Sequence, residues 1–117
     1  GLPATLDLAR AVRVTLDVAA GSGAEAPAFT LKRGQVAVLA LKNDSPQPAI
    51  VALFGHHARL LDRLDDGWKP FWVDTLLVPP RTTERIAFLA EHAGRFPIET
   101  TAPVWGAPRR ARWYTVA

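Results

Sequence analysis

The sequence predicts an all-β fold, a Greek-key β-sandwich of about eight strands. Three observations predict it. Runs of β-favouring residues recur about every ten residues, Gly, Pro, Asn and Asp separate these runs, and no extended helical periodicity is present. With 117 residues, of which 49% are hydrophobic, the chain can bury one core, so we expect residues 1–117 to form a single domain.

The predicted strands follow one another along the chain. Residues 12–18 alternate apolar and polar side chains, which is typical of a half-buried strand. Residues 35–43 are apolar at most positions, which indicates a central strand. Pro97 interrupts the run 94–101 and predicts an edge or a bulge there. The other predicted strands are 49–54, 57–64, 72–78, 83–90 and 111–116.

Composition excludes several classes of function. The chain contains no cysteine and no methionine, which rules out disulfides, thiolate catalysis, iron–sulfur clusters and blue-copper thiolates. No apolar run approaches the roughly 20 residues that span a bilayer, so we expect no membrane span. The net charge of +3 is mostly scattered along the chain, which does not indicate a nucleic-acid partner.

Asp74 stands out as an acidic residue within the apolar segment WVDTLLV. An unpaired carboxylate in a buried strand is costly. We therefore expect Asp74 to have a structural role, hydrogen-bonded or paired with an arginine.

Several separated motifs occur in an order that is characteristic of one family. They are Gly55-His56, WVDT at 72–75 with VPP at 78–80, and AGRF at 93–96. With these motifs the chain, from Leu2 to Val116, resembles the C-terminal cupredoxin domain of the multicopper oxidases, the laccase and copper-efflux oxidase family. The resemblance implies a β-sandwich of cupredoxin type and, in the family, oxidation that depends on copper.

The resemblance also implies where copper ligands would lie. The family's His-x-x-His-x-His set falls on Ala49, Ala52 and Phe54. Its His-Cys-His-x-x-x-His set falls on four further positions, and its axial methionine has no counterpart. None of these residues can replace an imidazole or a thiolate as a copper ligand, so we predict no copper cofactor in this domain. The four further positions are Glu99, Thr100, Thr101 and Trp105.

The chain retains three histidines, His56, His57 and His92. His56 matches a family histidine that is not a copper ligand. On an extended strand His56 and His57 point to opposite faces, so they do not easily share one ion. We expect hydrogen-bonded or surface histidines, with His92 exposed. A weak alternative is metal binding by His56 or His57 with a carboxylate such as Glu99.

Aromatic and basic side chains form a candidate interaction surface. Tryptophans crowd the segment 68–72, and the segment PRRARW carries three arginines. Core packing of the aromatics and solvation of the arginines is the simpler interpretation, but both residue types dominate interface hot spots. The candidate surface comprises Trp68, Trp72, Arg109, Arg110 and Arg112.

Together with the replaced ligands, the resemblance implies a copper-free structural or binding module of a longer multicopper-oxidase-like protein, without redox activity of its own. Expected partners are other cupredoxin domains of the parent chain or a separate protein, and the isolated domain can self-associate. The start at Gly1 without a methionine leads us to expect a trimmed piece of a longer chain. Copper-free relatives in the bacterial envelope imply a periplasmic or secreted location.

Two alternatives remain open. In the first, the parent is an oxidase that keeps its copper elsewhere, and this chain is its structural third domain. In the second, the chain is an independent metal-binding or ligand-binding module that uses His56, His57, Glu99 and the aromatic residues.

Overall fold

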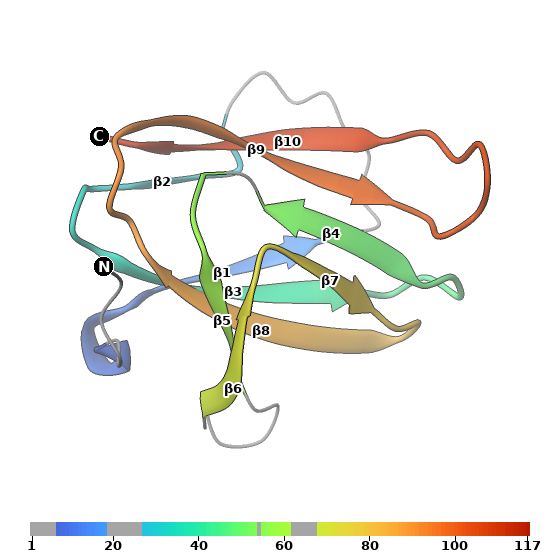
Figure 1. The fold of residues 1–117 in the computed structure, drawn as a ribbon, viewed down its shortest axis with the longest axis horizontal. Helices are drawn as coiled ribbons and strands as arrows, with labels where there is room; N and C mark the ends of the chain where they lie inside the picture. Colours follow the sequence, from blue (N-terminus) through green and yellow to red (C-terminus); the bar gives the residue numbers. More distant parts are fainter. Residues whose placement is uncertain (1–6, 19–26, 54, 62–67) are drawn as a thin grey trace.

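The fold consists of two five-stranded β-sheets that enclose a common apolar core (Figure 1). The computed structural model describes residues 7–18, 27–53, 55–61 and 68–117, and for residues 68–73 it describes the backbone alone. This part contains one short 3-10 turn, η1 (Leu8–Arg10), and no helix in it is long and apolar enough to cross a membrane. Its ten strands are β1 (Val12–Asp17), β2 (Phe29–Leu31), β3 (Val36–Asn43), β4 (Ala49–Leu53), β5 (Ala58–Leu61), β6 (Trp68–Val73), β7 (Thr75–Val78), β8 (Thr82–Leu89), β9 (Gly94–Thr101) and β10 (Arg110–Val116).

The first sheet has the strand order β1-β3-β8-β5-β6. β3 lies between β1 and β8, and most of its residues are buried, as its apolar sequence predicts. β1 is an edge strand that pairs with β3 in parallel, from Val12 opposite Ala37 to Asp17 opposite Lys42. It exposes every second residue, so both the central strand and the half-buried strand are confirmed.

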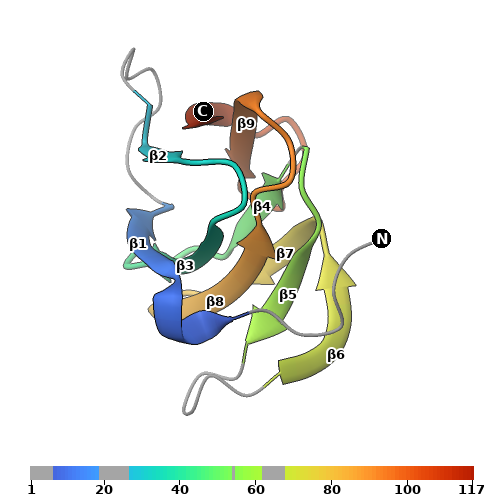
Figure 2. The same ribbon diagram turned by 90° about the vertical axis from the view of Figure 1, so that its left-hand side faces the viewer.

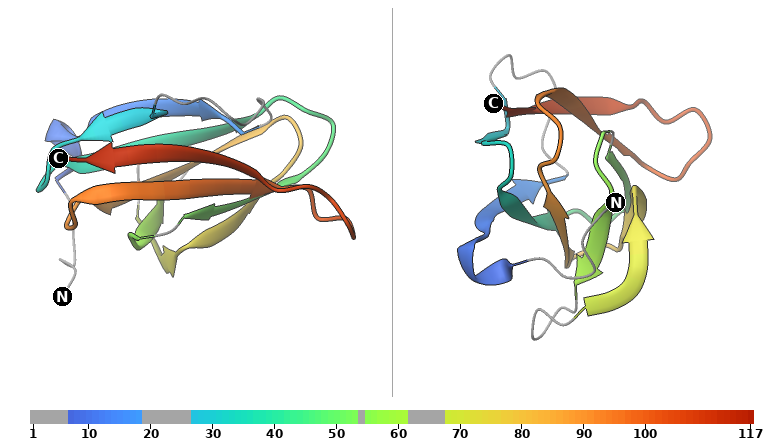
Figure 3. Two further views of the ribbon diagram at one scale, coloured as in Figure 1. Left: turned by 90° about the horizontal axis from the view of Figure 1, so that it is seen from above. Right: turned by 60° about the vertical axis from the view of Figure 1, so that its left-hand side comes forward.

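The second sheet has the strand order β2-β10-β9-β4-β7 and covers the other side of the core (Figure 2). β9 is an interior strand, antiparallel to both β10 and β4, and runs beside β10 towards the loop that joins them (Figure 3). The edge predicted from Pro97 is therefore wrong, and the β9–β10 register runs without a shift through Pro97, so the bulge predicted as its alternative is wrong as well. Pro97 lies opposite Trp113 of β10, and the β4 ladder begins one residue later, at Ile98. Among the described residues, Pro97 therefore pairs with β10 alone.

The structure has two strands more than the eight predicted. β2 was not predicted, because a strand of three residues carries too little pattern to detect. The predicted strand 72–78 is divided at Asp74 into β6 of the first sheet and β7 of the second. Asp74 is exposed at this crossing and accepts a hydrogen bond from the Leu53 N–H through its carbonyl oxygen. The expected burial of its carboxylate is therefore wrong, and no partner is needed to offset it.

Tyr114 lies in the middle of the aromatic part of the core. Its side chain is fully buried, and its ring stacks on Phe29 with 5.0 Å between ring centroids. Phe88 and Phe96 contact it from other sides, at 5.7 and 5.3 Å. These rings come from both sheets, so Tyr114 joins the two layers.

Gly55, in the connection from β4 to β5, is required by close packing as well as by its backbone. Its φ of +100° lies in the region that side chains disfavour, and a Cβ atom there would overlap the Phe96 ring. That ring is held between His56 and Tyr114, so it cannot move aside without disturbing the core. Gly34 has a similar φ of +93° but open space around its Cβ position.

We predict that Gly55→Ala lowers the free energy of unfolding by at least about 1.5 kcal/mol more than Gly34→Ala does. Both substitutions introduce the same backbone strain, of about 1–2 kcal/mol, and Gly55→Ala adds the clash with Phe96. Urea unfolding followed by circular dichroism measures the difference. Equal losses for the two variants would contradict the packing argument.

Candidate functional site

The two segments that the resemblance assigns to copper ligands lie on neighbouring strands, β4 and β9. The strands are antiparallel, with Ala52 opposite Glu99 and Val51 opposite Thr100. Side chains alternate between the two faces of a sheet, and along β4 the residues Ala49 and Val51 are buried whereas Ala52 is not. Ala49 and Thr100 therefore face the space between the sheets, and Ala52 and Glu99 face outward.

Neither face has side chains that fit copper. Ala49 and Ala52 have no donor atom, and the hydroxyl of Thr100 is a poor ligand for a transition metal. The Glu99 carboxylate forms an ion pair with Arg109, with 3.7 Å between Oε2 and Nη1. Within residues 7–18, 27–53, 55–61 and 68–117, no group of three His, Cys, Asp or Glu side chains is arranged to hold a metal ion.

The remaining ligand positions that the structure describes add no side chain suited to copper. Thr101 is the last residue of β9. Trp105 lies in the loop between β9 and β10, with its side chain fully exposed. Phe54 lies outside the residues that the structure describes.

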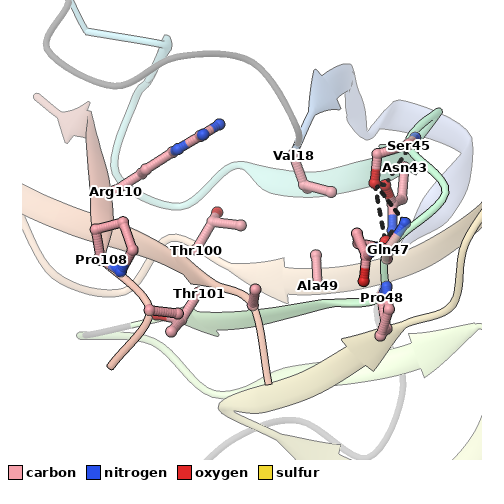
Figure 4. Close-up of a pocket in the computed structure, with 12 residues that line it drawn as sticks. Val18, Asn43, Ser45, Gln47, Pro48, Ala49, Thr100, Thr101, Pro108 and Arg110 are labelled. Carbon is pink, nitrogen blue, oxygen red and sulfur yellow. Dashed lines mark hydrogen bonds between the residues drawn. The ribbon is translucent and has the colours of Figure 1, made fainter. Parts of the chain in front are cut away.

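A pocket of about 290 Å³ opens at this end of the sandwich, beside Ala49 and Thr100 (Figure 4). Larger side chains at these two positions would fill it, since protein interiors are otherwise close-packed. The pocket is lined by Val18, Asn43, Ser45, Gln47, Pro48, Ala49, Thr100, Thr101, Ala102, Ala107, Pro108 and Arg110.

One side of the pocket is a hydrogen-bonded turn between β3 and β4. Asn43 is fully buried, and its Nδ2 donates to the carbonyls of Gln47 and Val78, at 2.8 and 3.1 Å. Its Oδ1 accepts from the backbone N–H and the hydroxyl of Ser45, at 3.1 and 2.8 Å. These bonds occupy the polar atoms of Asn43, which therefore shapes the wall. This role of Asn43 was not predicted from the sequence, although an Asn that ends an apolar strand before Asp-Ser-Pro is a signal for such a turn.

The opposite side of the pocket carries Thr100, Thr101 and Arg110 (Figure 4). The hydrogen bonds drawn in Figure 4 join Asn43, Ser45 and Gln47. Arg110 is exposed and has an interaction of its own within the protein. The pocket thus has one side that is satisfied internally and one that presents hydroxyl and guanidinium groups.

His56 lies in a buried polar position between β4 and β5. It is 6% exposed, its Nδ1 is 2.7 Å from the Tyr114 hydroxyl oxygen, and its Nε2 is 3.3 Å from the backbone nitrogen of His92. A backbone N–H can only donate, so Nε2 accepts this bond through its lone pair. Neutral His56 therefore carries its proton on Nδ1 and donates it to Tyr114.

Both members of this buried pair stay neutral at pH 7. Burial, together with the nearby His92, lowers the pKa of His56 from its ordinary value of 6.5, and Glu91 acts more weakly in the opposite direction. Burial raises the pKa of the Tyr114 hydroxyl. Protonation of His56 would place an N–H on Nε2, facing the N–H of His92, and would break that hydrogen bond.

The three residues considered as weak metal-ligand candidates do not form a common site. His57 is exposed whereas His56 is buried, as expected for neighbouring residues that point to opposite sides. Glu99 lies on the outward face of β9, and these three residues form no metal-binding group. His92 is exposed, so its predicted exposure is confirmed.

The candidate interaction surface is described in part. The side chains of Trp68 and Trp72 lie outside the described residues. Arg109 and Arg110 are exposed at the foot of the β9–β10 loop, and Arg112 is half-buried. Trp105, in the loop that ends at Arg109, is fully exposed, whereas the resemblance assigned it to a ligand position.

We predict that the free energy of unfolding decreases as the pH is lowered below about 6.5. The unfolded chain binds a proton at His56 near the ordinary pKa, whereas the folded chain binds it at a lower pH, so acid favours the unfolded state. The contribution of His56 to the free energy of unfolding is fully present above pH 6.5. It decreases by up to about 1.4 kcal/mol per pH unit as the pH falls towards the pKa of His56 in the folded chain. Urea unfolding between about pH 5 and pH 8 measures this slope.

Two variants test whether His56 causes this dependence of the free energy of unfolding on pH. His56→Phe should flatten it, because the titrating ring is gone, and His57→Ala should leave it unchanged, because His57 is exposed. A slope that persists in His56→Phe would contradict the role given to His56.

Solved structures of multicopper oxidases share this fold, although no protein-family model and no curated protein sequence matches the chain. Lac15 from a marine microbial metagenome matches with a TM-score of 0.79 and 23% identity, over 97% of this chain and 28% of Lac15. The multicopper oxidase of Pseudomonas thermotolerans matches with a TM-score of 0.71 and 22% identity, over 97% of this chain and 31% of that chain. McoA of Aquifex aeolicus matches with a TM-score of 0.62 and 20% identity, over 97% of this chain and 30% of McoA.

The chain spans less than one third of the length of each of these three oxidases. At such identities the likeness establishes the fold, whereas function depends on the residues of the site. The chain therefore has the cupredoxin-type β-sandwich fold that forms one part of multicopper oxidases.

Proposed function

We propose that this chain is a copper-free structural or binding module of a longer multicopper-oxidase-like protein, without redox activity of its own. The observation that carries the proposal is the side-chain chemistry on β4 and β9. These strands bring together the positions that the resemblance assigns to copper, with Ala52 directly opposite Glu99. They supply two alanines, threonines and one carboxylate, whereas a copper site of the family type needs several imidazoles and a thiolate.

The remaining imidazoles do not compensate for these replacements. Both ring nitrogens of His56 are engaged in hydrogen bonds within the protein. His57 and His92 are exposed, and neither belongs to a group of three metal-binding side chains among the described residues.

The loop between β9 and β10 supports a binding role. Trp105 is fully exposed and Val104 is 65% exposed, and the side chain of Arg109, in the same loop, is 76% exposed. Large apolar residues beside arginine are characteristic of interface hot spots. We infer that this loop contacts a protein partner, either another domain of the parent chain or a separate protein. The isolated chain would then be prone to self-association.

The parent protein and its location are part of the same proposal. The chain covers 28–31% of the first two oxidases that it resembles, which supports a parent with further domains. This observation equally supports a second candidate, in which the chain is the structural third domain of an oxidase that holds copper elsewhere. Histidine- and cysteine-rich motifs in the flanking parent sequence distinguish the two. A periplasmic or secreted location is proposed from the resemblance alone.

We predict that Cu(II) added to the purified chain produces no blue absorption band, no saturable one-to-one EPR signal and no rise in melting temperature. A metal that binds tightly to the folded state must stabilise it, so the thermal shift checks the spectroscopic result independently. The matched control is the variant His57→Ala with His92→Ala, which removes the exposed imidazoles and leaves the buried His56 in place.

The control decides what any copper signal means. Weak binding that this variant abolishes comes from surface imidazoles and agrees with the proposal. One-to-one binding that raises the melting temperature and persists in the variant would overturn it.

A further inference from the structure

The pocket beside Ala49 presents mainly hydrogen-bond donors. The Asn43 side is occupied by its own hydrogen bonds to Ser45 and Gln47. On the other side, a guanidinium provides five N–H donors, and a threonine hydroxyl donates as well as accepts. Arg110 already has an interaction within the protein, but five donors allow it a second partner. A ligand that fits this side is therefore rich in acceptors.

The charge around the pocket favours an anion. A smaller cavity adjoins the pocket and shares Val18, Thr100 and Arg110 with it, and Asp17 and Arg112 also line this cavity. Two arginines and one carboxylate thus lie along the combined space. A guanidinium pairs well with a carboxylate, because its planar donors match the two oxygens.

The rest of the lining favours an apolar body of limited size. Val18, Ala49, Ala107 and two prolines contribute hydrocarbon surface. The volume of about 290 Å³ lies near the lower end of the range for small-molecule sites, roughly 300–1,000 Å³. The pocket therefore suits a compact molecule.

We propose that this pocket binds a small carboxylate with an apolar body. The carboxylate lies against Arg110 and the hydroxyl of Thr100, which face each other across β9 and β10, and the body lies against Ala49 and Val18. This inference rests on the proposed function. Because the proposed function leaves the family's ligand positions without copper, the side chains at these positions are available to contact an organic ligand. The inference adds the chemical class of that ligand.

A titration with benzoate tests the proposal. Benzoate has one carboxylate and one compact apolar ring, and its neutral counterpart benzamide has nearly the same shape. In two-dimensional ¹H–¹⁵N spectra of the chain with EDTA present, benzoate should cause saturable shifts at the amides of Ala49, Thr100 and Arg110. We expect a Kd of about 1 mM or lower and at least about 10-fold weaker binding of benzamide.

Matched variants locate the site. Arg110→Gln should weaken benzoate binding at least about 10-fold, whereas Arg109→Gln, next to it but outside the pocket lining, should change it less than about 2-fold. Ala49→Leu should abolish binding by filling the pocket. Thr100→Val keeps the side-chain shape but removes the hydroxyl, so it should weaken benzoate binding, and it tests the site if Ala49→Leu does not fold.

The outcomes separate this inference from the proposed function. Absence of saturable shifts at the pocket, equal binding of benzamide, or equal losses in Arg109→Gln and Arg110→Gln would each overturn the inference. None of these results changes the copper titration. A copper site in the chain would instead overturn the proposed function and leave the benzoate result, measured with EDTA, to be judged separately.

Discussion

The buried hydrogen bond between His56 and Tyr114 lies where the chain passes from one sheet to the other after β4, and the same imidazole also contacts the passage after β8. His56 lies between β4 of the second sheet and β5 of the first, and Tyr114 lies in β10 of the second. The other ring nitrogen of His56 accepts the N–H of His92, between β8 of the first sheet and β9 of the second. The His56 imidazole thus links two of the connections between the sheets, β4–β5 and β8–β9, to strand β10. Leaving any of these buried groups unpaired would cost about 1–3 kcal/mol.

Aromatic packing around this bond contributes to the cohesion of the cupredoxin-type frame. Phe88 and Phe96 contact the His56 ring at 5.2 and 4.7 Å between centroids. The β4–β9 ladder, which holds copper ligands in the family, here buries Val51, Leu53 and Ile98. The ladder is therefore part of the core. The small residues at the interior-facing ligand positions leave a pocket where larger side chains would have filled the space.

Local patterns in the sequence predicted most of the sheets and little of the site. Alternation and apolar runs located the half-buried β1 and the central β3, because these signals are local. The crossing at Asp74 and the parallel pairing of the short β2 with β10 depend on tertiary contacts. His56 and Tyr114 are 58 residues apart, so no spacing rule connects them. The resemblance assigns ligand positions to β4 and β9, but the pocket beside them depends on Asn43 and on loops that converge after folding.

The protonation state of His56 tests the central claim that this histidine holds the fold together and has no lone pair to offer a metal. Long-range ¹H–¹⁵N correlation spectra of the imidazoles, recorded near neutral pH, identify which ring nitrogen carries the proton. The structure predicts the neutral Nδ1–H form for His56, with an Nδ1 proton protected by its bond to Tyr114 and a ring that stays neutral below the ordinary histidine pKa. A neutral Nε2–H form, or a ring that titrates with an ordinary pKa, would contradict it.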